Sequence, residues 1–268
     1  MIRHYFGINK NPFDFENVEL LPHQEKVVEI LNAHAHIGGL STIIGEPGTG
    51  KTVIKKTMQN KTKQDKRYTV ACVGRTLHTY RNTIQILCDA FEIEPEHSSY
   101  KSERKLINEA YELYRAGKFL ITIIDEAHLM EIDTLRRLRL MFDDFPKNHN
   151  LILIGLPSLM QKLSLKVNDD IKSRVTYSEA LQKLNPDDME KFIYSQLEKA
   201  GLGHHVFSPE SIELIVRYSE GVIRRARNLS LSSMIQAVRA QTKEVNTQIV
   251  NEVLRQPHWR KEYDMEEI

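Results

Sequence analysis

The chain has 268 residues, of which 41% are hydrophobic and 27% charged, an ordinary balance for a protein that folds around a core. Lys and Arg number 37 against 36 Asp and Glu, so the overall charge gives no sign of a nucleic-acid partner. Two cysteines are too few for a disulfide framework, and the apolar run FLITII is too short to span a bilayer. These features favour a cytoplasmic protein without a membrane segment.

Five short apolar segments occur in the first two thirds of the chain, separated by polar stretches with helical patterns. Continuous apolar segments of this length, alternating with helices, are typical of buried parallel strands. We therefore predict an α/β fold with a five-stranded parallel sheet. The expected strands are residues 40–45, 68–74, 119–125, 151–155 and, less distinctly, 175–178.

The pattern changes near residue 182, where helical segments replace the alternation. One helix is expected to begin at the Asn185-Pro186 cap, and another to begin at Ser208 and end at Gly221. Further helical stretches follow, and the last residues are highly charged. The predicted domains are an N-terminal segment that packs on the core (1–39), an α/β core (40–182), a helical lid (183–256) and a charged tail (257–268).

A phosphate-binding loop follows the first expected strand. The segment GEPGTGKT matches the pattern G-x-x-x-x-G-K-[ST], with a strand before it and a helix after it. Gly48 and Gly50 allow backbone N–H groups to face phosphate oxygens, Lys51 reaches the β- and γ-phosphates, and the Thr52 hydroxyl binds Mg²⁺. ATP and Mg²⁺ are the expected cofactors. The predicted nucleotide-binding residues are Gly45, Glu46, Pro47, Gly48, Thr49, Gly50, Lys51, Thr52 and Val53.

Two acidic residues, Asp125 and Glu126, end the third expected strand. An acid at the carboxyl end of a central strand lies where ligands bind in open α/β sheets. We expect Asp125 to hold Mg²⁺ through a water, and Glu126 to position or deprotonate the attacking water. The alternative is an acidic helix N-terminus without a catalytic role. The phosphate loop upstream favours the catalytic interpretation.

The four letters from Asp125 to His128 spell the DEAH box of a helicase class. Such a helicase needs two complete α/β lobes, whereas here the α/β pattern ends near residue 182. The helicase interpretation therefore fails, and His128 is expected to pack or cap rather than to couple nucleotide to unwinding.

The order of elements resembles the AAA+ superfamily, an α/β core followed by a helical lid. Three segments, YFGINKNPF (5–13), GEPGTGKT (45–52) and LILIGLP (151–157), are similar to the ExeA-type family and its relatives, the TniB and MuB transposition-helper ATPases. This resemblance covers most of residues 1–255. It implies an AAA+ P-loop ATPase.

The resemblance implies two further roles, and the chain departs from the family pattern at one position. The segment GVIRRARN (221–228) is similar to a second-sensor helix, which would bring Arg224 to the γ-phosphate; the alternative is a solvated basic face. Arg174, just before the last strand, is in the region of an arginine finger that acts on a neighbouring subunit, although it could equally be a surface charge. Leu156 stands where a polar first sensor is common, and the nearest hydroxyl belongs to Ser158. A slow ATPase that works as a homo-oligomer is therefore expected.

Members of the ExeA-type family divide between secretion and transposition. The lack of a membrane segment and of a domain after the lid favours a transposition helper, whose ATP-bound subunits assemble on duplex DNA and recruit or activate a transposase. The expected DNA contacts are Arg75, Thr76, His78 and Arg81, with a solvated surface given equal weight. Two alternatives stay open: an ExeA-like ATPase that acts on protein partners without DNA, and an ATP-binding scaffold that hardly hydrolyses.

The segment 133–144 predicts an ordinary packed helix. Leu135, Leu138 and Phe142 recur at helical spacing and should face the core. Asp133 with Arg137, and Arg139 with Asp143, are expected to form ion pairs one turn apart.

Overall fold

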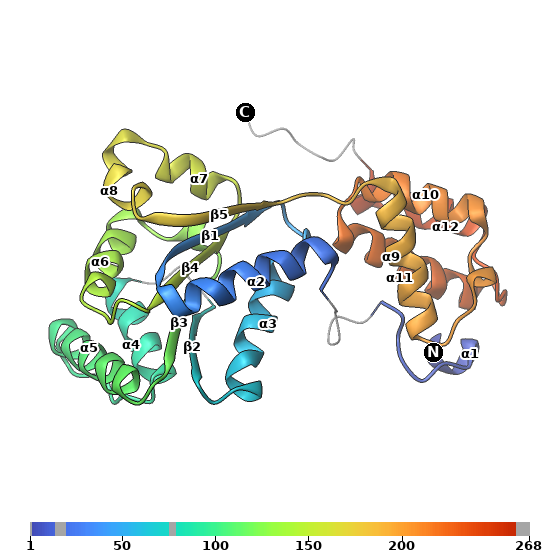
Figure 1. Cartoon of the computed structure of the whole chain (residues 1–268). Helices are drawn as coiled ribbons and strands as arrows, with labels where there is room; N and C mark the ends of the chain where they lie inside the picture. Colours follow the sequence, from blue (N-terminus) through green and yellow to red (C-terminus); the bar gives the residue numbers. More distant parts are fainter. Residues whose placement is uncertain (1, 14–19, 75–78, 261–268) are drawn as a thin grey trace. The chain divides into compact units, whose positions relative to one another are not determined.

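The computed structural model of the chain describes residues 2–13, 20–74 and 79–260 (Figure 1). These residues form two compact units. The sheet unit comprises residues 20–46, 50–74 and 79–181, and the helical unit comprises residues 2–13, 47–49 and 182–260.

A five-stranded parallel sheet forms the centre of the sheet unit, as predicted. Its strands are β1 (Gly39–Gly45), β2 (Tyr68–Val73), β3 (Phe119–Ile124), β4 (Asn150–Gly155) and β5 (Val175–Leu181). Their order in the sheet is β2-β3-β4-β1-β5, and every pairing is parallel. Strand β5 continues beyond the predicted end at residue 178. It lies at the sheet edge and alternates between exposed and partly buried residues, so it lacks the continuous apolar letters of a central strand.

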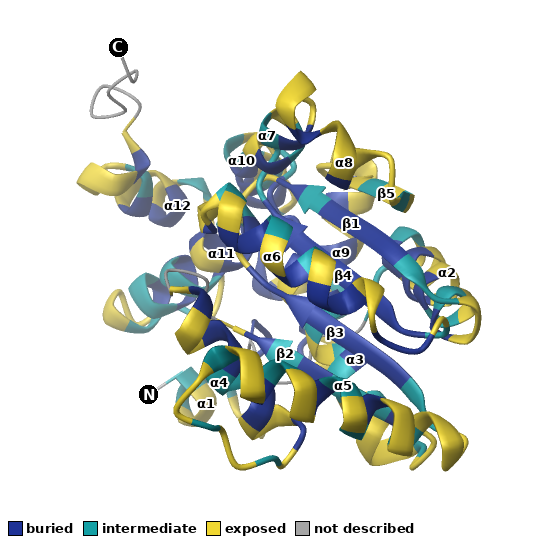
Figure 2. Cartoon of the chain, turned by 90° about the vertical axis from the view of Figure 1, so that its left-hand side faces the viewer, coloured by how far each residue is buried: buried dark blue, intermediate teal, exposed yellow. Residues whose placement is uncertain are grey.

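Helices cover both faces of this sheet. One face packs against α2 (Pro22–Ile37) and α3 (Lys51–Gln64), and the other against α4 (Tyr80–Ala90), α5 (Ser99–Arg115) and α6 (Ile132–Asp143). Figure 2 shows that the strands between these layers are largely buried.

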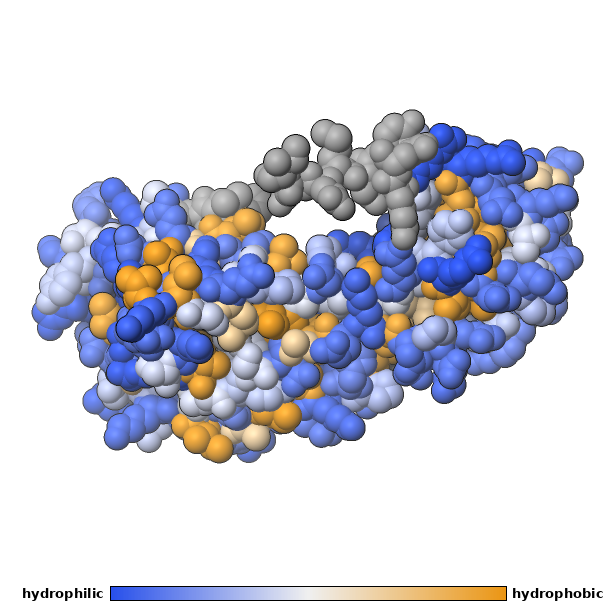
Figure 3. Space-filling view, turned by 90° about the horizontal axis from the view of Figure 1, so that it is seen from above, coloured by the Kyte–Doolittle hydropathy of each residue, from blue (hydrophilic) through white to orange (hydrophobic). Residues whose placement is uncertain are grey.

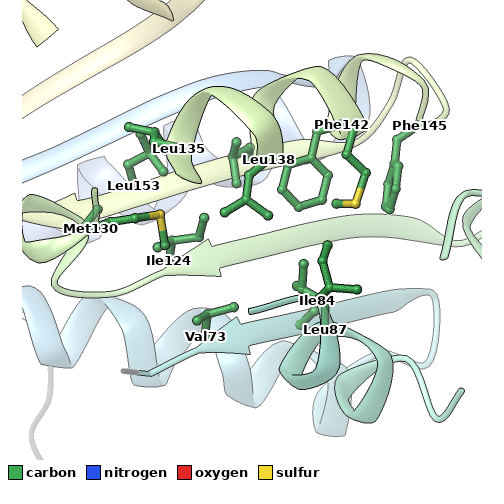
Figure 4. Close-up of a cluster of buried hydrophobic side chains, with 14 of the residues drawn as sticks. Val73, Ile84, Leu87, Ile124, Met130, Leu135, Leu138, Phe142, Phe145 and Leu153 are labelled. Atoms are coloured by element: carbon green, nitrogen blue, oxygen red, sulfur yellow. The ribbon is translucent and has the colours of Figure 1, made fainter. Parts of the chain in front are cut away.

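Successive residues of each central strand point to opposite layers, as the pleat of a strand requires. Leu151 and Leu153 of β4 join the cluster on the α4–α6 side, whereas Ile152 and Ile154 join the cluster on the α2–α3 side. Figure 4 shows the first cluster, in which Leu138 of α6 packs above the sheet. Leu138 is fully buried, and its truncation to alanine would cost about 2–5 kcal/mol.

Helix α6 confirms the predicted packing but changes one ion pair. Leu135, Leu138 and Phe142 are buried, and Arg139 lies 3.0 Å from Asp143. Asp133, however, pairs with Arg136 at 3.2 Å instead of Arg137. The guanidinium of Arg137 lies 3.8 Å from the centre of the Tyr80 ring, where a cation–π contact replaces the expected ion pair.

Short helices complete the sheet unit after β3 and β4. A 3₁₀ turn, η1 (Ala127–Leu129), follows the acidic pair, and α7 (Ser158–Leu163), η2 (Lys166–Asn168) and α8 (Asp169–Lys172) join β4 to β5.

The helical unit contains α1 (Ile2–Phe6), α9 (Pro186–Lys199), η3 (His204–Val206), α10 (Pro209–Ser219), α11 (Ile223–Arg239), α12 (Thr247–Leu254) and η4 (Pro257–Trp259). Both predicted caps are present. Asn185 Oδ1 accepts the Asp188 backbone N–H at 2.8 Å, and Ser208 Oγ accepts that of Ser211 at 3.2 Å.

The contacts of the chain ends differ from the expected boundaries. Residues 2–13 belong to the helical unit, and only the part from residue 20 packs on the sheet. Phe13 is buried, and its carbonyl oxygen accepts a hydrogen bond from the Arg227 guanidinium at 2.8 Å. A buried guanidinium requires such an acceptor, which explains the attachment. Trp259 is also buried, so the start of the expected tail is folded.

The surface is mainly hydrophilic, with hydrophobic residues interspersed on the face that Figure 3 shows. Within the described ranges, no helix combines the length and the apolar character that crossing a membrane requires.

Candidate nucleotide site

The sheet topology brings three loops to one edge. The phosphate loop follows β1, Asp125 follows β3, and Leu156 follows β4, which lies between β1 and β3. Because all three strands are parallel, their carboxyl ends meet at the same edge, where open α/β sheets bind ligands.

Glycine is required at position 50 of the phosphate loop. Gly50 has φ 105° and caps the N-terminus of α3, so Lys51 is the first helical residue. A Cβ at this position would lie 2.1 Å from Nε2 of the buried Gln24 side chain. The loop can therefore enter the helix only through a residue without a side chain. The N-terminus of this helix offers positive potential to an anion.

Lys51 is folded back over the loop from which it projects. Its buried ammonium donates to the carbonyl oxygens of Gly45, at 2.6 Å, and Glu46, at 3.0 Å. Thr52 follows on the exposed side of the first helical turn, and the Val53 N–H donates to the Gly50 carbonyl at 2.9 Å. The ammonium is thus held beside the loop by acceptors that a phosphate can replace.

Asp125 is buried and engaged through both carboxylate oxygens. Oδ1 accepts the Glu126 backbone N–H at 3.0 Å, and Oδ2 forms an ion pair with Lys55 of α3. Sequence reasoning missed Lys55. The available signal was its position four residues after Lys51, which places both lysines on one side of the helix.

Glu126 has a left-handed backbone, with φ 52°, and its side chain is 47% exposed. This conformation is uncommon for a residue other than glycine and is often found at functional sites.

His128 connects the acidic pair to the end of β4. Its Nδ1 lies 3.5 Å from Glu126 Oε2 and accepts the Leu156 backbone N–H at 3.4 Å. Burial lowers the pKa of His128, with a further decrease from Lys51 and Lys162, so the neutral imidazole is favoured. The packing role expected from the sequence is therefore incomplete, because His128 also contacts the first-sensor position.

The two arginines predicted from the resemblance lie in different units. Arg174 of the sheet unit is 55% exposed, and its Nη1 lies 3.2 Å from Asp143 Oδ1. Arg224 is exposed in the first turn of α11, and its backbone N–H lies 3.4 Å from the carbonyl oxygen of Gly48 within the helical unit. The neighbouring Arg225 pairs with Glu220 at 2.7 Å. Because Arg225 is paired and Arg227 is buried, the arginines of the segment 221–228 do not form a uniformly solvated basic face.

Three of the four predicted DNA contacts, Arg75, Thr76 and His78, lie outside the described residues. Arg81 is exposed near the start of α4. Two other cations of the sheet unit have partners within the chain: Arg67 pairs with Asp65 at 2.7 Å, and Lys105 with Glu96 at 2.6 Å.

The oxygen donors at the sheet edge suit Mg²⁺. The Asp125 carboxylate and the Thr52 hydroxyl are hard ligands, and Mg²⁺ is commonly held by one or two carboxylates together with substrate phosphates. Within the described ranges, no group of three or more His, Cys, Asp or Glu residues could hold a metal ion. The Asp125 carboxylate and the Thr52 hydroxyl would leave the remaining ligand positions of a Mg²⁺ ion to nucleotide phosphates and waters.

Comparisons with known proteins agree with this geometry. Residues 35–163 match the AAA domain family. The chain is 27% identical over 241 residues to General secretion pathway protein A of Aeromonas hydrophila, which covers 84% of this chain and 42% of that protein. The chain thus spans less than half of this relative.

Solved structures share the fold. The Aeropyrum pernix ORC2 protein in ADPNP–ADP complexes matches with a TM-score of 0.70 and 18% identity, over 91% of this chain and 70% of that chain. Drosophila ORC bound to DNA matches with a TM-score of 0.68 and 17% identity, over 97% and 67%. The Thermotoga maritima RuvB Holliday junction branch migration motor matches with a TM-score of 0.59 and 16% identity, over 87% and 67%. The fold is that of AAA+ P-loop ATPases, and the relative supports the ExeA-type resemblance.

Proposed function

We propose that the chain binds ATP with Mg²⁺ at the carboxyl edge of its sheet and hydrolyses it slowly. The observation that carries this proposal is the contact between α3 and the end of β3. Lys55, one turn after Lys51, reaches Asp125, and Asp125 is followed by Glu126. The phosphate loop and the acidic pair are therefore neighbours in space, as phosphoryl transfer requires.

Each residue has a separate task in this proposal. Lys51 exchanges the carbonyl oxygens of Gly45 and Glu46 for the β- and γ-phosphates. Thr52 and Asp125 would hold Mg²⁺, which supplies charge neutralisation at the phosphates when bound. Glu126, with its exposed carboxylate, accepts a proton from the attacking water.

Hydrolysis is expected to be slow because the end of β4 carries Leu156 in place of a polar side chain. Arg174 would complete the site of a neighbouring subunit, where an arginine stabilises charge on the transferred phosphoryl group. Its exposed position in the sheet unit suits a contact with a second copy of the chain. Arg224 would sense the γ-phosphate.

For the partner, we propose that ATP-bound subunits assemble on duplex DNA and recruit or activate a transposase. The support is the basic segment around Arg75–Arg81, together with the fold shared with a protein whose solved structure is bound to DNA. Phosphate contacts by such cations give affinity with little sequence preference.

A second candidate is an ATPase that acts on protein partners without DNA. The similarity to General secretion pathway protein A favours it.

One experiment separates these candidates. Duplex DNA of increasing length is mixed with the protein in the presence of ATP, a non-hydrolysable ATP analogue or no nucleotide, with Lys51→Ala as the control. Binding that requires nucleotide, increases cooperatively with DNA length and disappears in K51A supports assembly on DNA. A folded protein that binds ATP but no DNA in any nucleotide state rejects it and leaves the protein-directed ATPase. A Glu126→Gln variant that matches the wild type in every partner assay would instead indicate a scaffold that does not need hydrolysis.

A further inference from the structure

The Lys55–Asp125 ion pair occupies the carboxylate that the proposed site needs for its metal ion. The side chains of Lys55 and Asp125 are 18% and 11% exposed, so the pair is largely shielded from water. The second oxygen of Asp125 already accepts the Glu126 N–H at 3.0 Å. Within this structure the carboxylate therefore has its charge balanced by Lys55.

The position of Lys55 on α3 explains why it reaches this carboxylate. Lys51 and Lys55 are separated by four residues and project from the same side of the helix. Lys51 is held by the loop carbonyl oxygens, and Lys55 extends to the end of β3. Lys51 thus binds neutral carbonyl oxygens that phosphates would replace as its acceptors, whereas Lys55 neutralises the carboxylate that the metal ion would use.

Cys72 is a partly buried thiol on the strand beside β3. It lies near the end of β2, next to β3 in the sheet. Burial raises the pKa of the Cys72 thiol, while Lys55 lowers it and Asp125 raises it. At the largely shielded Asp125 carboxylate, the Lys55 ammonium and a divalent cation would repel each other.

We propose that Lys55 is an internal counter-cation that competes with Mg²⁺ for Asp125. This inference rests on the proposed Mg²⁺–nucleotide site and adds a residue that sets its metal requirement. A divalent ion alone must displace the Lys55 ammonium from Asp125. A nucleotide adds phosphate oxygens as further ligands of the metal ion, and their negative charge offsets the positive charge that the ion brings beside Lys55. Lys55 therefore couples metal binding to nucleotide binding.

The test compares Lys55→Met with the wild type by two binding measurements. Methionine keeps an unbranched apolar stem and removes the charge. The first measurement is Mn²⁺ binding by electron paramagnetic resonance without nucleotide. The second is the affinity for a fluorescent ADP analogue with Mg²⁺ and with EDTA. Loss of a shielded ion pair predicts about 3- to 10-fold tighter Mn²⁺ binding without nucleotide. The ratio of the two ADP affinities should rise by less, because the nucleotide phosphates already offset the added charge in the wild type.

Matched variants control for general effects of charge and stability. Lys63→Met removes an exposed cation from the same helix and should bind Mn²⁺ as the wild type does. Lys55→Arg keeps a cation at the site and should also retain the wild-type metal requirement. Lys55→Gln provides the same test where K55M does not fold.

The outcomes distinguish this inference from the proposed function. Equal Mn²⁺ affinities in K55M, K63M and wild type would overturn the role of Lys55 while leaving nucleotide binding intact. Weaker Mg²⁺–ADP binding by K55M would also overturn it, because Lys55 would then be a phosphate ligand. If the folded wild type binds no nucleotide with or without Mg²⁺, the proposed function itself fails.

Discussion

His128 Nδ1 lies 3.5 Å from Glu126 Oε2, so the proposed general base has an imidazole as its neighbour. The same nitrogen accepts the backbone N–H of Leu156 at 3.4 Å, and Lys162 donates to the His128 carbonyl oxygen at 2.7 Å. His128 is thereby attached to the ends of both β3 and β4. The neutral Nδ1 accepts from Leu156 and has no proton to donate to Glu126, so His128 positions Glu126 through the backbone that it holds between these strand ends.

The first prediction is that His128→Ala lowers kcat for ATP hydrolysis about tenfold and changes the KM for ATP little, because it disturbs the base rather than the phosphate loop. Asn can accept the Leu156 N–H, so His128→Asn should recover part of the loss. Steady-state kinetics measure both constants. An increase of about tenfold in the KM for ATP with an unchanged kcat would contradict a positioning role.

The pH dependence of hydrolysis follows from the same contact. Burial lowers the pKa of His128, so the imidazole is neutral near pH 7 and Nδ1 can accept a hydrogen bond. Protonation at lower pH puts a proton on this nitrogen, which can then no longer accept from Leu156 and instead donates to Glu126 Oε2, engaging the proposed base. Wild-type kcat should therefore fall with decreasing pH more steeply than that of H128N, measured from about pH 5.5 to 8.

The second prediction concerns Arg174 and a neighbouring subunit. Arg174→Ala should leave the unfolding free energy within about 1 kcal/mol of the wild type, because an exposed ion pair contributes little. Hydrolysis by the assembled protein should fall at least about tenfold, since an arginine finger contributes much to phosphoryl transfer. Thermal unfolding and phosphate release measure the two effects.

Two controls make the Arg174 experiment specific. Asp143→Asn removes the ion pairs of Asp143 with both Arg174 and Arg139 but keeps the Arg174 guanidinium, and it should hydrolyse ATP at the wild-type rate. Mixing R174A with E126Q should restore part of the activity, because some interfaces then combine an intact Arg174 with an intact Glu126. No recovery on mixing would argue against action across subunits.

The sheet and the phosphate loop could be predicted because their signals are local. An apolar strand, a glycine-rich turn and a helix start lie within one short segment, Leu40–Val53, and all three signals favour the same strand–loop–helix structure. Asp125 and Glu126 could be placed for a similar reason, as the end of an apolar strand.

The contacts made by Lys55 and His128 depend on tertiary structure and could not be predicted in this way. Lys55 looks like one of many cations on a polar helix until β3 is placed beside α3. The same limit applies to Arg227, which resembled a solvated charge but is buried against Phe13. Burial and partner choice are set by packing, which one segment of sequence does not encode.

The third prediction is that Gly50→Ala destabilises the protein more than Gly117→Ala. Both glycines have positive φ values, 105° and 76°, so alanine is strained at each by about 1 kcal/mol. Only Gly50 has a neighbour in the way, Gln24 Nε2 at 2.1 Å from the added Cβ, whereas nothing lies within 4 Å at Gly117. Urea unfolding should show an excess loss of about 1–3 kcal/mol for G50A, together with loss of nucleotide binding.

A double variant separates the two causes at position 50. Gln24→Ala removes the steric conflict but not the strain of positive φ. Gly50→Ala should therefore cost less unfolding free energy in the Q24A background than in the wild type, but it should still cost some. Full additivity of the two substitutions would show that the predicted conflict is absent.

The fourth prediction is that Arg227→Met releases the N-terminal residues from the helical unit. The guanidinium donates to the buried Phe13 carbonyl at 2.8 Å, and methionine leaves that acceptor unpaired. The expected cost is about 1–3 kcal/mol. Limited proteolysis should cut near residues 2–13 faster than in the wild type. Arg239→Met removes an exposed cation from the same helix and should leave the cleavage rate unchanged.

The fifth prediction concerns acid sensitivity at His149. Burial lowers the pKa of His149 to about 3, where the ring is stacked 4.7 Å from Phe142 and Nε2 lies 2.9 Å from Thr122 Oγ1. The folded state therefore binds the proton more weakly than the unfolded state, whose ordinary pKa is 6.5. The neutral His149 therefore costs the folded state nothing above pH 6.5, and stability decreases as the pH falls from 6.5 toward 3. The decrease in the unfolding free energy is about 3 kcal/mol at pH 4. His149→Gln keeps a partner for Thr122 without titrating, so its unfolding free energy should fall less between pH 6.5 and 4 than that of the wild type. Thr122→Val lowers stability but keeps the titrating ring, and it should retain the wild-type pH slope. Identical slopes for H149Q and wild type in urea unfolding would show that His149 protonation does not limit acid stability.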